Sequence, residues 1–516
     1  MLRKYRFILT LSLWVVAFSG YAQKSSNNSH ELRLASALGS NMVLQQNEPI
    51  TIWGEARPGT KILAQLDDEK SNTTADQQGN WRVTFKARKA SFEPISLKVN
   101  DLNLQNILIG EVWLCSGQSN MNFKLKDIDT YDSIIDCTAN NKLRILQHTN
   151  IRIVAKNGYS DEELARCNTQ NFFDAEWVVS EKETVGEASA VAWLFGHGLQ
   201  HKLDVPVGII QVALGGSALN NWIPPGALQA NPSTKSLFAT DWLENEQVKL
   251  AHRERARDAF QNVLTPGKPY MAGQFPYRWL CEPGFLFEAG IAPLQHLPFR
   301  GVLWYQGESD TDNAEMVEAA KDLFPLMVNE WRAYFNRGDF PFIYVQLPGF
   351  KNELWPEFRE MQKQAQQTLA NTAMVVSLDL GDPKNIHPKD KQRVGERAVH
   401  NALKYVYGFN DLSGSPKPEN WVQDKDEITL RFSECGDGLQ SATDTIFGFE
   451  VAGKNGDFKT AKACIASENT LRILSPVKEV QWLRYGWMPF PNPPLTLYNS
   501  ELLPLGPFRI NLNNQF

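Results

Sequence analysis

Two residues, Ser119 and His387, have side chains that could together carry out acyl transfer. Ser119 lies in the run Ser-Gly-Gln-Ser-Asn at 116–120, and His387 lies in Asn-Ile-His-Pro at 385–388. A serine on a glycine-containing turn and a histidine from a distant loop can act as nucleophile and base. Each residue alone is weak evidence, because a serine after a strand more often caps a turn or a helix. Their combination predicts hydrolysis of an acyl ester.

The elements that must position these residues are short apolar runs that alternate with helical segments. The strand candidates are 107–115, 206–214, 301–306, 342–347 and 373–379. Helical faces are predicted around 191–199 and 316–334, where apolar residues recur with the period of a helix. This alternation is typical of a parallel sheet covered on both sides, so we expect a three-layer α/β domain. Ligands of such sheets bind beyond the carboxyl ends of the strands, where four of the five candidates end in polar residues.

The rest of the chain has a different pattern on either side of this α/β domain. Residues 31–105 show short alternating strands separated by Pro-Gly and Gly-Asn turns, which predict a small β-sandwich domain. The α/β domain is expected over 106–410, with 223–290 as an insertion that passes over the strand ends. Residues 411–516 return to short strands rich in proline and glycine, so we expect a β-rich C-terminal segment.

The first 22 residues predict export of the protein. Arg3, Lys4 and Arg6 precede an apolar run at 7–18 and small residues that end at Ala22, as in a secretory signal peptide. The run is shorter than the ~20 residues of a membrane span, and no other long apolar stretch follows. We therefore expect no membrane span after cleavage, and a periplasmic or extracellular location.

Charge and cysteine content limit the possible ligands. Lys plus Arg number 52 against 58 for Asp plus Glu, a net charge of −6, which gives no basic footprint for nucleic acid. None of the six cysteines has the spacing of a metal site, so no metal and no cofactor are expected. In an exported protein we expect the disulfides Cys137–Cys167 and Cys435–Cys464, with Cys115 a buried thiol in a strand.

Several motifs together resemble one known family. They are GEVWLCSGQSNM at 110–121, WYQGESD at 304–310, DLGDPKNIHPKDK at 379–391, NMVLQQNEPITIWGEARPG at 41–59, LRYGW at 483–487 and PFR at 507–509. This set resembles the sialate O-acetylesterase family of the SGNH (GDSL-like) hydrolases, and it extends over nearly the whole chain after the signal peptide. The block around Ser119 is the most specific, and the block around His387 is the next.

The resemblance implies a role for each matching residue of the catalytic centre. Ser119 would be the nucleophile and His387 the general base and then acid, which suits an imidazole that titrates near ~6.5. The oxyanion hole would consist of the backbone N–H of Ser119, the N–H near Gly216 and the side chain of Gln306. Glycine suits that position because its backbone can approach a ligand closely.

Several residues could be the acid that orients His387. Many SGNH enzymes place an aspartate three residues before the histidine, but Lys384 occupies that position here. Asp382 is preferred because it lies on the same loop, Glu308 would reach the histidine from the third strand, and Asp379 is a further alternative. The remaining alternative is that a backbone carbonyl group, and not a carboxylate, orients His387.

The resemblance implies a carbohydrate substrate but does not fix the sugar. Gln118, Asn120, Trp222 and Tyr305 are expected to bind substrate, the last two by stacking on a sugar ring unless they pack in the core. The block FEAG at 287–290 departs from the family. We expect a secreted serine esterase of O-acetylated carbohydrate, with acetylated sialic acid first and a plant polysaccharide such as acetylxylan second. A non-catalytic glycan-binding protein is the alternative of another class.

Overall fold

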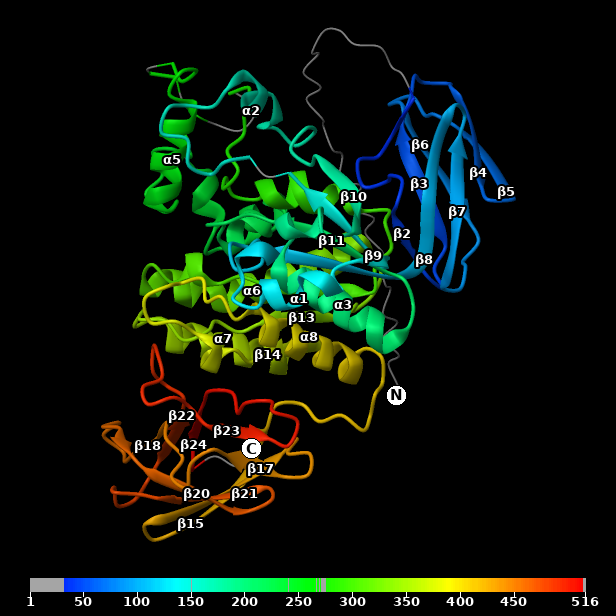
Figure 1. The fold of residues 1–516 in the computed structure, drawn as a ribbon. Coiled ribbons are helices and arrows are strands. Elements are labelled where there is room, and N and C mark those ends of the chain that lie inside the picture. The colour runs from blue at the N-terminus through cyan, green and yellow to red at the C-terminus, as the bar shows by residue number, and fades with distance from the viewer. Residues whose placement is uncertain are drawn as a thin grey trace, which may run out of the picture.

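The computed structural model describes residues 32–149, 151–239, 241–265, 267–268, 270 and 275–513. The predicted signal peptide at 1–22 lies outside these residues. Figure 1 shows a β-rich N-terminal part, a central α/β part and a β-rich C-terminal part, which lie at different sides of the molecule. Among the described residues, no helix has the length and apolar character that crossing a membrane requires.

The N-terminal part consists of two small sheets that are mainly antiparallel. One contains β1 (Arg33–Leu34), β3 (Ile50–Glu55) and β6 (Asn80–Phe85). The other contains β4 (Lys61–Leu66), β5 (Glu69–Thr74), β7 (Ser91–Val99) and the start of β8 (Leu102–Gly117), with β2 (Val43–Gln45) parallel to β8. In β6 the buried residues Trp81, Val83 and Phe85 alternate with exposed ones, as the sequence predicts for a half-buried strand.

A single long strand joins the N-terminal part to the central sheet. The first half of β8 pairs with β7, and residues 111–117 pair with two strands of the central sheet. The domain boundary expected between residues 105 and 106 therefore lies inside one continuous strand. Because β8 ends just before Ser119, the N-terminal part is tied directly to the strand that carries this serine.

The central sheet is mostly parallel. Its strand order is β10 (Ala175–Ser180), β9 (Asn140–His148), β11 (Val207–Ala213), β8, β12 (Gly301–Tyr305), β13 (Phe342–Val345) and β14 (Thr372–Val375). Only β10 runs antiparallel to its neighbour. All five predicted strands are present. β9 and β10 were not predicted, because their sequences NNKLRILQH and AEWVVS mix polar and apolar residues.

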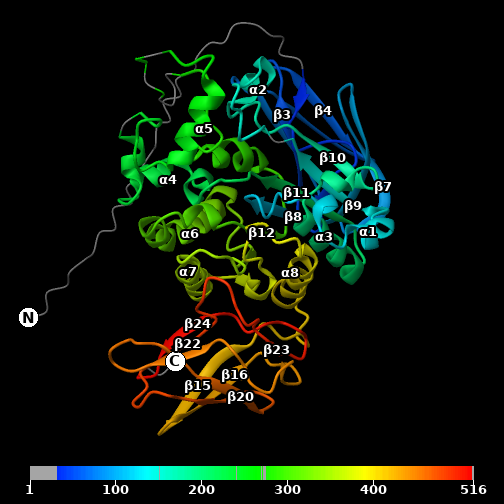
Figure 2. The same cartoon turned by 60° about the vertical axis from the view of Figure 1, so that its left-hand side comes forward.

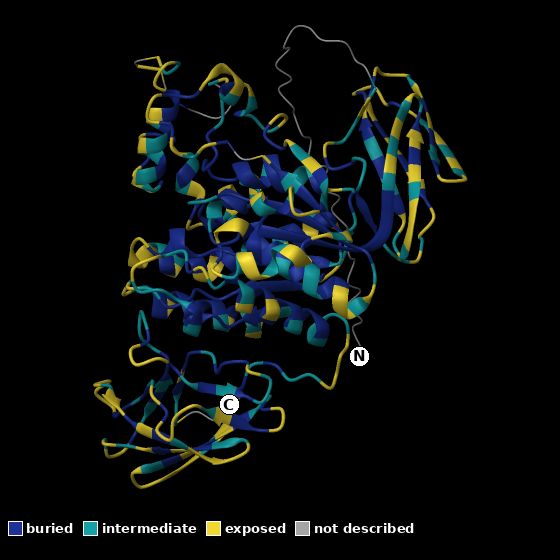
Figure 3. Ribbon diagram, in the orientation of Figure 1, coloured by how far each residue is buried: buried dark blue, intermediate teal, exposed yellow. Residues whose placement is uncertain are grey.

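Helices cover both faces of this sheet. On one face, α3 (Ala190–Leu203) and α8 (Lys391–Tyr405) pack on side chains such as Cys115 and Leu303. On the other face, α6 (Ala314–Phe335) and α7 (Trp355–Thr368) pack on their neighbours Leu114 and Val302. Successive strand residues point to opposite faces, so each apolar strand supplies both cores. Figure 3 shows these strands buried along their length.

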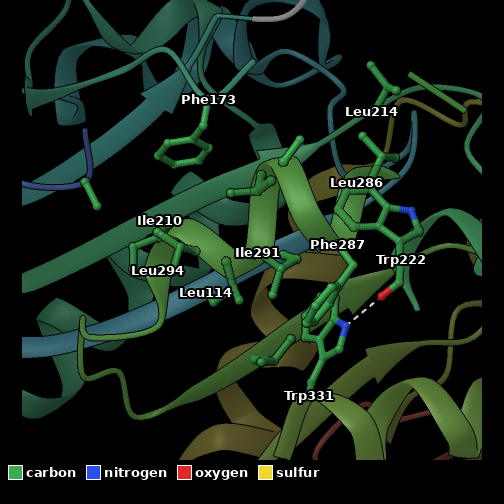
Figure 4. Close-up of a cluster of buried hydrophobic side chains, with 14 of the residues drawn as sticks. Leu114, Phe173, Ile210, Leu214, Trp222, Leu286, Phe287, Ile291, Leu294 and Trp331 are labelled. Carbon is green, nitrogen blue, oxygen red and sulfur yellow. Dashed lines mark hydrogen bonds between the residues drawn. The ribbon is translucent and has the colours of Figure 1, made fainter. Parts of the chain in front are cut away.

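The insertion at 223–290 adds short helices at one end of the sheet. These are α4 (Pro225–Ala230) and α5 (Leu250–Phe260), while α1 (Tyr131–Ile134) and α2 (Asp161–Arg166) precede the insertion in the chain. The block that departs from the family forms the π-helical turn Phe287–Ile291. Figure 4 shows that Phe287 and Ile291 enter the core beside Trp331, whose Nε1 donates to the carbonyl oxygen of Trp222 at 2.8 Å. These residues therefore serve packing.

The C-terminal part is β-rich, as predicted, and contacts α7. Its strands are β15 (Lys417–Asp424), β16 (Glu427–Ser433), β17 (Leu439–Ser441), β18 (Phe449–Ala452), β19 (Lys459–Thr460), β20 (Lys462–Ser467), β21 (Thr470–Leu474), β22 (Trp482–Tyr485), β23 (Leu497–Asn499) and β24 (Phe508–Asn511). They form three antiparallel sheets. Figure 2 shows this part next to α7 and α8. The buried Arg359 of α7 donates to the carbonyl oxygens of Met488 and Pro489, which fixes the C-terminal part against the α/β part.

The cysteines do not form the expected disulfides. All six are free thiols, which corrects the predicted pairs Cys137–Cys167 and Cys435–Cys464. Cys137 is exposed, whereas Cys167 is fully buried at the end of α2. Cys115 is the expected buried thiol, and its burial raises the pKa of that thiol far above the usual range.

Candidate active site

The register of three neighbouring strands brings three loops to one edge of the sheet. Gly117 of β8 pairs with Ala213 of β11 on one side and with Tyr305 of β12 on the other. Because these strands are parallel and end at the same level, the residues that follow them are neighbours in space. The loops with Ser119, Gly216 and Gln306 are therefore adjacent, as the sequence predicts.

The turn before Ser119 requires glycine at position 117. Gly117 has φ of +140°, and a Cβ atom there would overlap the carbonyl oxygen of Tyr305 in the neighbouring strand. Any side chain would force β8 and β12 apart where the serine turn begins. The glycine thus allows the close strand approach that places Ser119 at the sheet edge.

Ser119 and His387 meet although 268 residues separate them in sequence. His387 Nε2 lies 2.8 Å from Ser119 Oγ, within hydrogen-bond distance, and both side chains are partly exposed. Burial, and secondarily the charge of Lys391, lower the pKa of His387 below its usual value. A lowered pKa favours the neutral imidazole, which is the form that can accept a proton from the serine.

Among the described residues, none of the three candidate acids is bonded to the histidine. Oδ1 of Asp382 accepts from the backbone N–H groups of Lys384 and Asn385 at 2.8 and 3.1 Å. Asp379 forms a buried ion pair with Arg397. Across the described part of the chain, no carboxylate forms a hydrogen bond with His387. The structure therefore does not give Asp382 the expected contact, because its carboxylate organises the turn that precedes the histidine.

Glu308 belongs to a buried network centred on Asn120. The Asn120 side-chain amide donates to Oε1 of Glu308 and, at 3.0 Å, to the carbonyl oxygen of Ile386, the residue before His387. Oδ1 of Asn120 accepts from Nζ of Lys391 at 2.5 Å. Asn120 is fully buried, which corrects its assignment to substrate binding. It links the serine turn to the histidine loop and to the start of α8.

Lys391 was not identified in the sequence analysis. It is fully buried, and burial lowers the pKa of its ammonium group to about 7, while burial raises the pKa of Glu308. Its position in the sequence could have revealed its burial. Val394, Ala398 and Ala402 follow it at the intervals of one buried helix face, so Lys391 belongs to the same face. A lysine on such a face needs a polar partner, and Asn120 provides it.

The loop after β11 can supply part of an oxyanion hole. A Cβ atom built on Gly215 would lie 3.5 Å from Cβ of Ser119, so this turn borders the nucleophile directly. Within the described residues, the backbone N–H groups of Ser119 and Gly216 have no hydrogen-bond partner. His252 of α5 was not predicted as a site residue. Its Nε2 lies 2.7 Å from the carbonyl oxygen of Gly216, within hydrogen-bond distance, and this contact fixes the turn.

Gln306 and Gln118 fix the loops at this edge of the sheet through side-chain hydrogen bonds. Nε2 of Gln306 donates to the carbonyl oxygen of Ser217 at 3.2 Å and to the carboxylate of Asp310. Its two amide hydrogens thus bond within the protein in this structure, and its role in the oxyanion hole stays a prediction. Oε1 of Gln118 accepts from the N–H groups of Gly307 and Ser309 at 3.3 and 3.2 Å. Gln118 is buried and fixes the loop after β12, so the structure gives it a bracing contact in place of the expected substrate contact.

The predicted stacking aromatics are core residues. Trp222 is 0% exposed, packs edge-to-face on Trp304 and donates to Oγ of Ser217 at 3.0 Å. Tyr305 is also 0% exposed and lies within the core below α8. Neither ring presents a face to solvent, which corrects the expectation that they stack on a sugar.

Comparisons with known proteins show which proteins this chain is similar to. Residues 277–404 match the family described as carbohydrate esterase, sialic acid-specific acetylesterase. The chain is 27% identical to the sialate O-acetylesterase of Homo sapiens, over 98% of this chain and 96% of that protein. It is likewise 27% identical to the sialate O-acetylesterase of Mus musculus, over 94% of this chain and 95% of that one.

A solved structure extends the similarity to the fold. The crystal structure of a carbohydrate acetylesterase from Xanthomonas citri superposes with a TM-score of 0.72 at 26% identity, covering 93% of this chain and all of that one. The similarity thus includes the N-terminal and C-terminal β parts as well as the central sheet. Residues 277–404 thus match the sialic acid-specific acetylesterase family of carbohydrate esterases, and the chain as a whole is similar to sialate O-acetylesterases and to a carbohydrate acetylesterase.

Proposed function

We propose that this protein is a serine esterase that removes O-acetyl groups from sialic acid through an acetyl-enzyme. The observation that carries the proposal is the 2.8 Å contact between Ser119 Oγ and His387 Nε2, at a sheet edge where the backbone N–H groups of Ser119 and Gly216 have no partner among the described residues. The names of the full-length relatives support sialic acid as the sugar. An acetylated plant polysaccharide such as acetylxylan is the second candidate substrate.

The mechanism follows from this contact. Nε2 of His387 takes the proton of Ser119 Oγ as the oxygen bonds to the acetyl carbonyl carbon. The backbone N–H groups of Ser119 and Gly216 stabilise the negative charge on the carbonyl oxygen. The C–O bond to the sugar then breaks, and protonated His387 gives its proton to the leaving sugar oxygen. Water then attacks the acetyl-serine as His387 takes one of its protons, the bond between the acetyl carbon and Ser119 Oγ breaks, His387 returns the proton to Oγ, and acetate leaves.

We further propose that the catalytic domain is an SGNH-hydrolase-like three-layer domain over 106–410, and that the protein is exported. The sheet covered by helices on both faces supports the first proposal. The basic and apolar residues at 1–22 support the second.

Acetate release from a panel of substrates tests the function. Wild-type protein should release acetate from O-acetylated sialic acids faster than from acetylated xylan. Ser119→Ala should abolish both activities, and Ser133→Ala, which changes an exposed serine of α1, should leave them unchanged. Faster release from xylan would favour the polysaccharide. The absence of acetate release from every ester, including p-nitrophenyl acetate, would favour a non-catalytic glycan-binding protein.

A further inference from the structure

One face of helix α5 lies against the glycine turn that borders the nucleophile. His252 of α5 contacts the carbonyl oxygen of Gly216 at 2.7 Å, and burial lowers the pKa of this histidine to about 4. The imidazole is therefore neutral and donates to that carbonyl oxygen. This bond fixes α5, and with it the insertion, to the edge of the active site.

Arg255 lies one turn further along the same face of α5. Residues three apart on a helix are neighbours, so Arg255 is directed to the same side as His252. A Cβ atom built on Gly216 would lie 3.3 Å from Nη1 of Arg255. Since Gly215 in turn borders Ser119, the guanidinium lies over the turn beside the nucleophile.

Arg255 differs from the two other arginines of α5 in having no hydrogen-bond or ion-pair partner among the described residues. Nε of Arg253 donates to the carbonyl oxygen of Val248 at 3.1 Å, and Arg257 pairs with Glu244 at 2.9 Å. Among the described residues, Arg255 has neither a hydrogen bond nor an ion pair, and its side chain is half-buried. A partly desolvated guanidinium without a counter-ion is suited to bind an anion.

The other cationic groups near the turn are already neutralised. Lys249, at the start of α5, pairs with Asp312 at 2.7 Å, and His252 is neutral. Arg255 is therefore an unpaired positive group at the glycine turn in the described structure, on the side of Ser119 that α5 covers. In a chain of net charge −6, such a local charge also offsets the general repulsion of an anionic substrate.

We propose that Arg255 binds the carboxylate of an acidic sugar whose acetyl ester is attacked by Ser119. The planar guanidinium presents paired N–H donors that match the two oxygens of a carboxylate. This inference rests on the proposed esterase function and makes it more specific, because neutral acetylated polysaccharides have no carboxylate for Arg255. Arg255 would then determine specificity without entering the chemical step.

Kinetics on three esters test this role. They are O-acetylated N-acetylneuraminic acid, the methyl ester of its carboxylate, and p-nitrophenyl acetate. In Arg255→Gln, KM for the free acid should rise ~10- to 100-fold with kcat little changed, because a charge-assisted bond is lost. Hydrolysis of the methyl ester and of p-nitrophenyl acetate should change less than about threefold. Arg257→Gln is the matched control on the same helix and should leave all three reactions unchanged.

The wild-type protein provides a test that does not depend on folding of the variant. It should prefer the free acid over the methyl ester by about the same factor that Arg255→Gln loses. Equal losses on all three esters in the variant would overturn the proposal in favour of an oxyanion or structural role. Equal wild-type rates on free acid and methyl ester would also overturn it, with the esterase function intact. Absence of turnover of any ester would overturn both.

Discussion

The buried asparagine next to the nucleophile gives the sharpest test of how the site is held together. Asn120 is fully buried and bonds to Glu308, to the carbonyl oxygen of Ile386 and to Lys391. Asn120→Ala leaves all three groups without that partner, and each unsatisfied buried group costs ~1–3 kcal/mol. Allowing for relaxation, we expect the free energy of unfolding to fall by about 3–5 kcal/mol, which corresponds to a melting temperature lower by roughly 10 °C.

The same substitution should reduce turnover, although Asn120 touches no reacting atom. It removes the link between the loops of Ser119 and His387, and a displacement of ~1 Å at a catalytic group costs about 100-fold in rate. Calorimetry and kcat on p-nitrophenyl acetate measure the two effects. Asn401→Ala is the control, since Asn401 is a buried asparagine of α8 that bonds to the Met374 carbonyl oxygen away from the site. A variant at position 120 with wild-type melting temperature and kcat would refute this account of the network.

Three further predictions concern the residues around His387, the pH dependence of kcat/KM and the effect of a chelator. His387→Ala should lower kcat by ~10³-fold or more. Asp382→Asn should lower kcat less than about tenfold, because the Asp382 carboxylate bonds to its own loop. A larger loss of kcat in Asp382→Asn would restore Asp382 as the orienting acid. The acid limb of kcat/KM should lie below pH ~6.5, since burial and the Lys391 charge lower the pKa of His387. Lys391→Met removes a positive charge and should move that limb to higher pH; a shift to lower pH would contradict the electrostatic explanation. EDTA should leave activity unchanged, and recovery of chelator-inhibited activity with Zn²⁺ would disprove this.

Much of the fold could be predicted because buried parallel strands have a recognisable sequence. The apolar runs at 206–214 and 301–306 became β11 and β12, and the polar residues that follow them lie at one edge of the sheet. Such strands are buried on both faces, so they read as continuous hydrophobic runs. β9 was missed because Asn140, Asn141 and Lys142 interrupt that pattern at its start.

Part of the candidate site, like part of the fold, could be predicted from the sequence, and part could not. The types of catalytic residue and the glycine at position 117 could be predicted from the sequence, because each belongs to a local motif, and the contact between Ser119 and His387 was inferred from two such motifs taken together. Three features became visible in the folded protein: Asp382 bonds to its own loop, Trp222 is in the core, and Lys391 reaches Asn120. Hydrogen-bond partners and burial depend on which loops meet in space. That meeting is set by strand register and helix packing over hundreds of residues, which no local pattern records.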